Sequence, residues 1–317
     1  MKGAAGVSIV IPNWNGSALL KKNVPDVLAA CASYAGPTEV IVVDDGSTDD
    51  SAGWLEATYS EVKIVRRERN EGFSSAVNDG LKVARHELVL LLNNDIELKP
   101  GFLEPLASEF QNDSDLFGAM SKQRIPGQKD AGRWEGGNWV RFRSGAFELR
   151  DLTAQPAVTR SDGVLVANGG CTLFSRAKLL ELGGFCTLFD PFYCEDTELS
   201  LQALLRGWHI VLCPSSVVTH HHASTTRRKP YRFYVIPMRN FLLLHWLTLD
   251  SAATWTAHLL YLVRTVFIRT FTAQPKFLLG LCLGLGLLPS VLDARGKRSR
   301  GKVISLGTLF RMDGGCA

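Results

Sequence analysis

Cysteine is sparse and unpatterned in this sequence: there are seven, an odd number, and no two stand in a CxxC spacing. This excludes a disulfide framework and a zinc ribbon, so we expect reduced thiols. The sequence has no GxxxxGK(S/T) segment, which excludes a P-loop nucleotidase, and no HExxH zinc motif. It also lacks an apolar run of about 20 residues, the length that a spanning helix needs. No cleavable apolar segment follows the first residues, so a cytosolic chain is expected.

Acidic residues are scarce in the last quarter of the chain. Residues 237–317 hold ten Lys and Arg against three Asp and Glu, whereas residues 1–236 hold 25 against 28. We therefore expect a catalytic α/β domain over residues 1–236 and a basic, apolar, helical tail over residues 237–317. The basic residues are not interleaved with stacking aromatics and form no known module, so nucleic-acid binding is not expected.

Strand and helix patterns alternate over the first hundred residues. The expected strands are 7–11, 39–43, 62–65 and 87–92, and the expected helices are 18–34, 51–59 and 74–84. This order predicts an α/β fold with a mostly parallel sheet covered by helices. Further along, we expect a strand over 164–174, helices over 176–182 and 197–206, and a strand over 209–212. Residues 122–165 show little periodicity and predict a loop-rich insertion or short hairpins that face the acceptor.

Two polar loops directly follow expected strands. Asp44-Asp45-Gly46-Ser47 ends the second strand, and Asn93-Asn94-Asp95 ends the fourth. The carboxyl ends of parallel strands form the ligand-binding edge of such a sheet, so both loops are expected at one cleft. A carboxylate there can accept a ring N–H of a uracil- or thymine-type base, and an Asp beside an amide can share a divalent cation with a diphosphate. Each loop alone also fits an ordinary capped turn, and that alternative stays open.

An acidic pair and a run of three histidines supply the remaining candidate groups. Glu195-Asp196 opens an expected helix, where it is either simple capping or a general base kept ionised by the helix dipole. His220 and His222 would share one face of an extended chain. Without companion cysteines they are not expected to form a zinc site of their own. We expect one of them to reach the same cation or diphosphate as Asp95.

The order and spacing of these segments resemble the family 2 glycosyltransferases, inverting enzymes of the GT-A fold that use nucleotide sugars. The matching segments are 7–16, 42–49, 70–73 with Asn78 and Gly80, 91–95, 169–171, 174–176, 183–185, 195–196, 198–199 and 206–208, leading to His220, Arg239 and Asn240. The resemblance covers roughly residues 6–245. It implies a GT-A (Rossmann-like), mostly parallel sheet flanked by helices, followed by the helical tail.

The resemblance also implies a pocket for a nucleoside-diphosphate sugar. The residues expected to contact it are Pro12, Asn13, Asn15, Asp45, Asn70, Gly72, Asn78 and Asn94. Pro12 and Asn13 resemble the first nucleotide-binding turn, and Asp45 resembles the acceptor for the base.

A divalent metal, Mg²⁺ or Mn²⁺, is implied in the same way. Asp95 resembles the metal ligand, with His220 and His222 as further candidates. Asn93 and Asn94 stand where many relatives carry Asp, so metal binding would depend more on the diphosphate and a histidine. This form of the motif resembles the rhamnosyltransferase-like branch of the family.

Asp196 resembles the catalytic base, with Glu195 as its supporting neighbour. The implied reaction is one displacement, in which the acceptor hydroxyl loses a proton to Asp196 and attacks the anomeric carbon opposite the leaving diphosphate. We therefore expect an inverting hexosyltransferase that acts on a glycan or lipid-linked acceptor in cell envelope polysaccharide synthesis. One alternative is a catalytically inactive carbohydrate-binding or scaffold protein with the same fold. Another is a sugar-nucleotide pyrophosphorylase, which would need a basic phosphate loop where this chain has residues 12–16.

The tail combines apolar stretches with basic residues. Residues 277–292 carry no charge but include three glycines and a proline, and five basic residues follow between 295 and 302. We expect amphipathic or re-entrant helices on an anionic membrane surface, which would place the protein peripherally on the inner face of the cell membrane. A helical subdomain packed on the body, or a contact in a homo-oligomer, is the alternative.

Overall fold

The computed structural model describes residues 4–126, 133–135, 137–151, 163–221, 232–272 and 275–312. The described strands are β1 (Val7–Asn13), β2 (Thr38–Asp44), β3 (Val62–Arg66), β4 (Leu88–Leu92), β5 (Ile96–Glu97), β6 (Leu116–Ile125), β7 (Arg133–Glu135), β8 (Asn138–Arg143), β9 (Ala146–Asp151), β10 (Val164–Val166), β11 (Cys171–Ser175) and β12 (His209–His220). The helices are α1 (Ser17–Ser33), α2 (Ser51–Thr58), α3 (Phe73–Val83), α4 (Leu103–Glu109), α5 (Arg176–Glu181), α6 (Glu195–Leu204), α7 (Arg232–Thr248), α8 (Ala252–Phe271), α9 (Pro275–Gly286), α10 (Leu288–Arg298) and α11 (Leu306–Met312), with a short 3-10 helix η2 (Thr187–Phe189).

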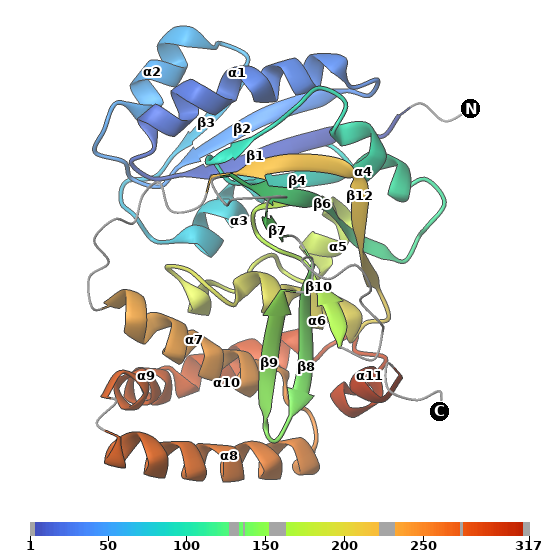
Figure 1. Ribbon diagram of the computed structural model, residues 1–317. Coiled ribbons are helices and arrows are strands. Elements are labelled where there is room, and N and C mark those ends of the chain that lie inside the picture. The colour runs from blue at the N-terminus through green and yellow to red at the C-terminus, as the bar shows by residue number, and fades with distance from the viewer. Residues whose placement is uncertain are drawn as a thin grey trace.

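The main sheet has the order β3-β2-β1-β4-β11-β6-β12-β5, with β7 paired to β6. Strands β3, β2, β1 and β4 run parallel, and Val10 of β1 pairs with Ile41 of β2 and Leu91 of β4. Successive side chains of a strand point to opposite faces. Ile9 and Ile11 therefore join one core cluster with α1, while Val10 joins a second cluster with α3. Figure 1 shows α1 and α2 on one face of these strands and α3 on the other, which confirms the expected α/β architecture.

The expected strand over 164–174 is wrong in one respect: it is two strands in two sheets. β10 pairs with β8 in a small three-stranded sheet, whereas β11 runs antiparallel to β4 and β6 in the main sheet. Gly169 and Gly170 lie in the segment between them, where the chain passes from one sheet to the other. The strand expected over 209–212 is also longer than expected and continues to His220.

The C-terminal helices pack against the small sheet and form a third core. This cluster joins apolar side chains of β8, β9, β10, α6 and the helices from α7 onward, in the lower half of Figure 1. Two buried histidines connect the helices of this core to the small sheet through hydrogen bonds. His245 donates through Nδ1 to Phe241 O at 2.6 Å and accepts the Phe147 N–H at 2.8 Å. His258 stacks on it at 4.5 Å between ring centres and contacts Gly145 O through Nδ1 at 2.8 Å.

The apolar run over 277–292 forms two helices, α9 and α10, that meet at an angle of 66°. α9 packs closely on α7, because a Cβ atom added at Gly280 would lie 2.8 Å from Met238 Cβ and one at Gly284 would lie 3.2 Å from the Trp246 ring. Within the part of the chain that the structure describes, no single helix has the length and hydrophobicity to span a membrane, whereas this bent pair passes on length and composition when taken together.

Candidate functional site

A cleft of about 480 Å³ opens at the carboxyl ends of β1, β2 and β4. Its lining residues are Pro12, Asn13, Trp14, Asp45, Asn70, Gly72, Phe73, Ala76, Asn93, Asn94, Asp95, Pro191 and Phe192. The polar loops that follow three parallel strands therefore meet in one place, as the topology requires. The segment before α6 closes the opposite side of the cleft.

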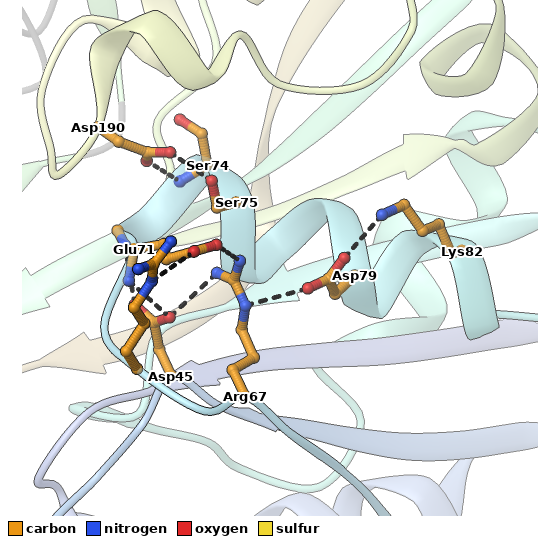
Figure 2. Close-up of polar contacts among 10 residues, drawn as sticks. Asp45, Arg67, Glu71, Ser74, Ser75, Asp79, Lys82 and Asp190 are labelled. Atoms are coloured by element: carbon orange, nitrogen blue, oxygen red, sulfur yellow. Dashed lines mark hydrogen bonds and ion pairs between the residues drawn. The ribbon is translucent and has the colours of Figure 1, made fainter.

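Asp45 lies at the inner end of this cleft and is only 4% exposed. Its Oδ1 accepts the Glu71 N–H at 3.1 Å and Arg67 Nη1 at 3.0 Å, and its Oδ2 accepts the Gly72 N–H at 2.9 Å (Figure 2). Each carboxylate oxygen can accept two hydrogen bonds. Oδ2 of Asp45 therefore keeps one acceptor position for a ring N–H of a base.

Arg67 was not predicted from the sequence, yet it orients the Asp45 carboxylate. Its side chain is 12% exposed and also pairs with Glu71, and its Nε lies 3.0 Å from Asp79 Oδ2 (Figure 2). No motif marks this arginine, because it reaches three carboxylates that are separated along the chain. Gly72 is required beside it: its φ is +110°, and an added Cβ would lie 2.7 Å from the Asp190 side chain.

The asparagines expected at the nucleotide join the strand ends to each other. Asn94 Nδ2 donates to Asn13 Oδ1 at 2.8 Å, which links the ends of β4 and β1. Asn15 Oδ1 accepts the Thr48 N–H at 2.7 Å and so holds the loop after β2. Pro12, Asn13 and Asn94 line the cleft, whereas Asn15 does not.

Asn78 lies on the far side of α3 from the other expected nucleotide contacts. Its Nδ2 donates to Phe185 O and its Oδ1 accepts the Phe185 N–H, both at 2.8 Å. It lines a separate hollow of about 340 Å³ with Gly183 and Gly184. The structure thus places Asn78 as a bridge between α3 and the loop after α5.

Asp95 faces His220, and a chain of hydrogen bonds fixes the imidazole tautomer. Asn168 Oδ1 accepts the Gly170 N–H, so it must also accept from Gln123 Nε2, at 2.8 Å. Gln123 Oε1 is then the acceptor for His220 Nδ1–H at 2.9 Å. In a neutral imidazole this leaves the Nε2 lone pair facing Asp95 Oδ1, 3.2 Å away. Two acceptors at this distance repel each other, so the pair needs a proton or a cation between them.

Asp95 Oδ1 is buried and has no hydrogen-bond donor among the residues that the structure describes, which fits a divalent cation held by Asp95 and His220. Among the residues that the structure describes, no group of three His, Cys, Asp or Glu side chains is placed to hold a metal ion. His222, the other expected ligand, lies outside the described residues. Asp95 and His220 are therefore the two candidate protein ligands among the described residues, and a diphosphate and water would complete the coordination shell.

Glu195 and Asp196 form the first turn of α6 and differ in their hydrogen bonds. Asp196 accepts the Gly169 N–H at 3.1 Å and the Thr197 N–H at 2.6 Å. Glu195 is 7% exposed, and its Oε2 has no partner among the described residues. Burial, with the charge of Asp196 added, raises the pKa of Glu195 well above its ordinary value. Burial also raises the pKa of Asp196, but its N–H donors oppose the rise. The N–H donors at Asp196 favour its ionised form, whereas nothing among the described residues does so at Glu195 Oε2.

Asp196 does not itself line the cleft but lies directly behind Gly169. A Cβ atom added at Gly169 would lie 3.3 Å from Phe73 Cζ, which lines the cleft, and 3.8 Å from Asp196 Oδ2. Gly169 therefore lies next to both the Asp196 carboxylate and the Phe73 ring of the cleft wall. Gln123 and Asn168, which set the tautomer of His220, were not predicted; the glycine pair after Asn168 was the only signal near them.

Comparisons with known proteins bear on this site. The model of the family described as Glycosyl transferase family 2 matches residues 8–183. The chain is 27% identical over 261 residues to an uncharacterized protein of Mycobacterium tuberculosis, which covers 77% of this chain and 76% of that protein. It is 32% identical over 220 residues to an undecaprenyl-phosphate 4-deoxy-4-formamido-L-arabinose transferase of Pseudomonas fluorescens, which covers 68% of this chain and 57% of the transferase. The chain thus spans about half the length of the transferases of this name that it matches.

Solved structures share the fold. GalNAc-T7 with UDP, GalNAc and Mn²⁺ superposes with a TM-score of 0.59 at 18% identity, over 78% of this chain and 49% of that one. A mannosyltransferase from Pyrobaculum calidifontis in complex with GDP-Man and Mn²⁺ superposes with a TM-score of 0.53 at 17% identity, over 98% and 79%. These likenesses confirm a GT-A-like α/β fold.

Proposed function

The chain belongs to glycosyl transferase family 2, and we propose that it moves a hexose from a nucleoside-diphosphate sugar to a hydroxyl of a glycan or lipid-linked acceptor, with inversion at the anomeric carbon. One observation carries the proposal: Asp45 and Asp95 line a single cleft, and Asp196 lies behind its wall at Gly169. Two carboxylates far apart in the sequence thus line a space large enough for a nucleotide sugar, and a third lies close behind it.

The nucleoside end of the donor is assigned to Asp45. Its remaining acceptor position on Oδ2 suits the ring N–H of uracil, thymine or guanine, and Arg67 fixes the direction of the carboxylate. Because Asn93 and Asn94 resemble the rhamnosyltransferase-like branch, a 6-deoxyhexose such as dTDP-rhamnose is the first donor to test.

The diphosphate end is assigned to Asp95 and His220, which would hold Mg²⁺ or Mn²⁺. The proteins of similar fold named above carry Mn²⁺ with their nucleotides. When bound, such a cation offsets the charge of the leaving diphosphate. Gln123 holds His220 with its Nε2 directed at Asp95, so the ligand pair is oriented before the donor arrives.

Asp196 is assigned the role of general base. Glu195 retains its proton, so Asp196 is the ionised member of the pair and takes the proton of the acceptor hydroxyl. The freed oxygen attacks the anomeric carbon while the bond from that carbon to the diphosphate breaks. A single displacement inverts the anomeric configuration and needs no carboxylate nucleophile, in contrast to a retaining glycosidase.

A donor screen tests this proposal. Thermal shifts with UDP, dTDP and GDP, each with and without Mn²⁺, report the base and the metal requirement together. Release of nucleoside diphosphate from the matching sugar donor then reports turnover. A chain that binds a nucleoside diphosphate but never releases one from any donor would instead be an inactive binding protein.

We also propose a peripheral position on the cytoplasmic face of the membrane, through α8. Leu259, Val263, Phe267 and Phe271 are spaced four residues apart and are 56%, 70%, 65% and 76% exposed. Residues at this spacing lie on one face of a helix. Figure 1 places α8 along the end of the molecule opposite to α1 and α2. The exposed apolar face of α8 is thus a surface suited to a lipid bilayer.

Charge supports a lipid surface over a second copy of the chain. Helix α8 carries two arginines and no acidic residue, so the charged side chains on this helix are all positive. Anionic phospholipid complements such a surface, whereas a second α8 would bring like charges together. An acceptor anchored in the membrane would then meet the cleft of a docked enzyme.

Vesicle flotation tests the α8 surface. The intact protein is expected to float with phosphatidylglycerol vesicles and less with phosphatidylcholine vesicles. The double variant Val263→Asp/Phe267→Asp should stay in the dense fraction, while the control Leu180→Asp, at a 45% exposed site on α5, should float. A wild-type dimer that never floats, and that the double variant converts to a monomer, would show a homo-oligomer contact instead.

A further inference from the structure

Asn240 of α7 is fully buried against the loop that precedes the acidic pair. Its Nδ2 contacts the backbone carbonyl oxygens of three loop residues. The distances are 2.5 Å to Phe189 O, 2.8 Å to Phe192 O and 3.0 Å to Tyr193 O. A side-chain amide has two N–H groups, so three carbonyls share two protons and gather around one nitrogen.

Arg239, the preceding residue, holds carbonyls that Asn240 does not reach. Its Nη2 lies 2.6 Å from Asp190 O and 3.4 Å from Leu188 O. Its Nε donates to Asn240 Oδ1 at 2.8 Å. That bond fixes which end of the amide is oxygen, and therefore directs Nδ2 toward the loop.

The loop needs this support because its end is conformationally unfavourable. Tyr193 and Cys194 have φ angles of 77° and 74°, in the left-handed region that non-glycine residues rarely adopt. Such residues persist only where the surroundings determine them. A loop released from α7 would relax these angles and turn the start of α6, where Asp196 lies.

The same loop fixes the other wall of the cleft. The Asp190 carboxylate accepts the Ser74 N–H at 2.8 Å and the Ser75 hydroxyl at 2.6 Å, and so caps α3 (Figure 2). The Phe73 N–H donates to Pro191 O at 3.0 Å. Movement of the loop would therefore reach α3 as well as α6.

We propose that Asn240 and Arg239 are positioning residues for the transfer reaction: from α7 they hold the 188–193 loop so that Asp196 keeps its place beside Gly169, next to the cleft, and Asp190 caps α3. This inference rests on the proposed role of Asp196 as the base. It assigns a role in catalysis to two side chains of the C-terminal helices that touch neither the cleft nor the acidic pair.

The test is Asn240→Asp, which keeps the size of the side chain and replaces the donor with an acceptor. We expect kcat for nucleoside diphosphate release to fall at least 100-fold, while calorimetric binding of UDP or dTDP with Mn²⁺ changes less than threefold. The acid limb of the kcat profile should move to lower pH, because a more hydrated Asp196 loses the effect of burial on its pKa. Hydrogen exchange at the Phe73 and Ser74 amides should rise.

Two further variants keep the test decisive. Leu247→Ala, a buried residue two turns further along α7, lowers the melting temperature without touching the loop and should leave kcat per folded molecule and the exchange at Phe73 unchanged. Arg239→Gln should lower kcat about tenfold, and it replaces Asn240→Asp as the test if that variant does not fold.

Some outcomes would overturn the proposal. One is a wild-type kcat and pH profile in both Asn240→Asp and Arg239→Gln. The other is a fall in kcat that Leu247→Ala shows to the same extent. The exchange readout separates this proposal from the base assignment. If Asp196→Asn kept full turnover, the base would be wrong, yet faster exchange at Phe73 and Ser74 in Asn240→Asp would still support the positioning role.

Discussion

The two walls of the cleft are constructed in different ways. The donor wall consists of strand ends whose polar residues bond to each other within residues 12–95, as Asn13 does to Asn94 and Asp45 to Gly72. The wall around Asp196 depends instead on distant helices: α7 holds the loop before it, and Arg298 of α10 pairs with Glu198 at 2.9 Å. The strand ends therefore hold each other in place, whereas the position of Asp196 depends on helices from the C-terminal third of the chain.

The largest expected effect separates chemistry from binding. Asp196→Asn removes the proposed general base and should lower kcat by about 10³-fold, a typical contribution of such a group, with the Kd for nucleoside diphosphate unchanged within twofold. Glu195→Gln mimics the protonated neighbour and should cost only about tenfold. Calorimetry beside a nucleoside diphosphate release assay measures both. Wild-type turnover in Asp196→Asn would remove the base assignment.

Arg298→Ala tests whether the packing of α6, the helix that carries Asp196 and Glu198, depends on α10. Glu198 is fully buried, and burial raises its pKa while the Arg298 guanidinium acts in the opposite direction. Removing the guanidinium leaves this group without its partner, so we expect a loss of about 3–5 kcal/mol in the free energy of unfolding, measured in urea. The double variant Glu198→Met/Arg298→Met should recover most of it. A loss below about 1 kcal/mol would mean that the pair contributes little.

Acid should weaken the helical region specifically. Burial lowers the pKa of His245 to about 3, against about 6.5 in an unfolded chain. The unfolded chain then binds the proton first, so this stabilisation is complete above pH 6.5 and decreases as the pH falls. The expected loss is about 2 kcal/mol between pH 6.5 and pH 5. Chemical denaturation across that range should show a smaller slope in His245→Gln than in the control His86→Gln; equal slopes would contradict the prediction.

The smallest effect concerns the donor wall alone. Asp45→Asn should weaken nucleoside diphosphate binding about tenfold, because the charged acceptor for the ring N–H becomes a neutral amide, and should leave kcat at saturating donor nearly unchanged. Asp79→Asn also contacts Arg67 but lies outside the cleft, so it serves as the control. A large fall in kcat with unaltered affinity would place Asp45 in the chemistry instead.

The sequence predicted the donor wall better than the wall around Asp196, for a physical reason. Buried parallel strands read as β-branched runs, and the topology requires their polar ends to meet, so the sequence alone predicts that Asp45 and Asp95 share a cleft. Arg67, Gln123 and Asn240 act through contacts between residues far apart in the chain. Such contacts cannot be predicted from the local pattern of residues.

The break at Gly169-Gly170 was missed for a related reason. Apolar residues stand at both ends of the segment 164–174, so the pattern predicts one strand. The chain divides there because β10 and β11 pair with different sheets, and pairing is a property of the whole fold.

Each carbonyl oxygen from Leu188 to Tyr193 lies within 3.4 Å of a nitrogen donor of the protein. These contacts leave the carbonyls of this segment fewer lone pairs with which to accept hydrogen bonds from the hydroxyls of a sugar. In the proposed reaction, this segment would contact the acceptor mainly through ring faces, those of Phe192 and the half-exposed Tyr193, whose ring centres lie 4.9 Å apart in an edge-to-face arrangement. Exchanging these two rings is thus a route to altered acceptor preference that leaves the framework of the enzyme in place.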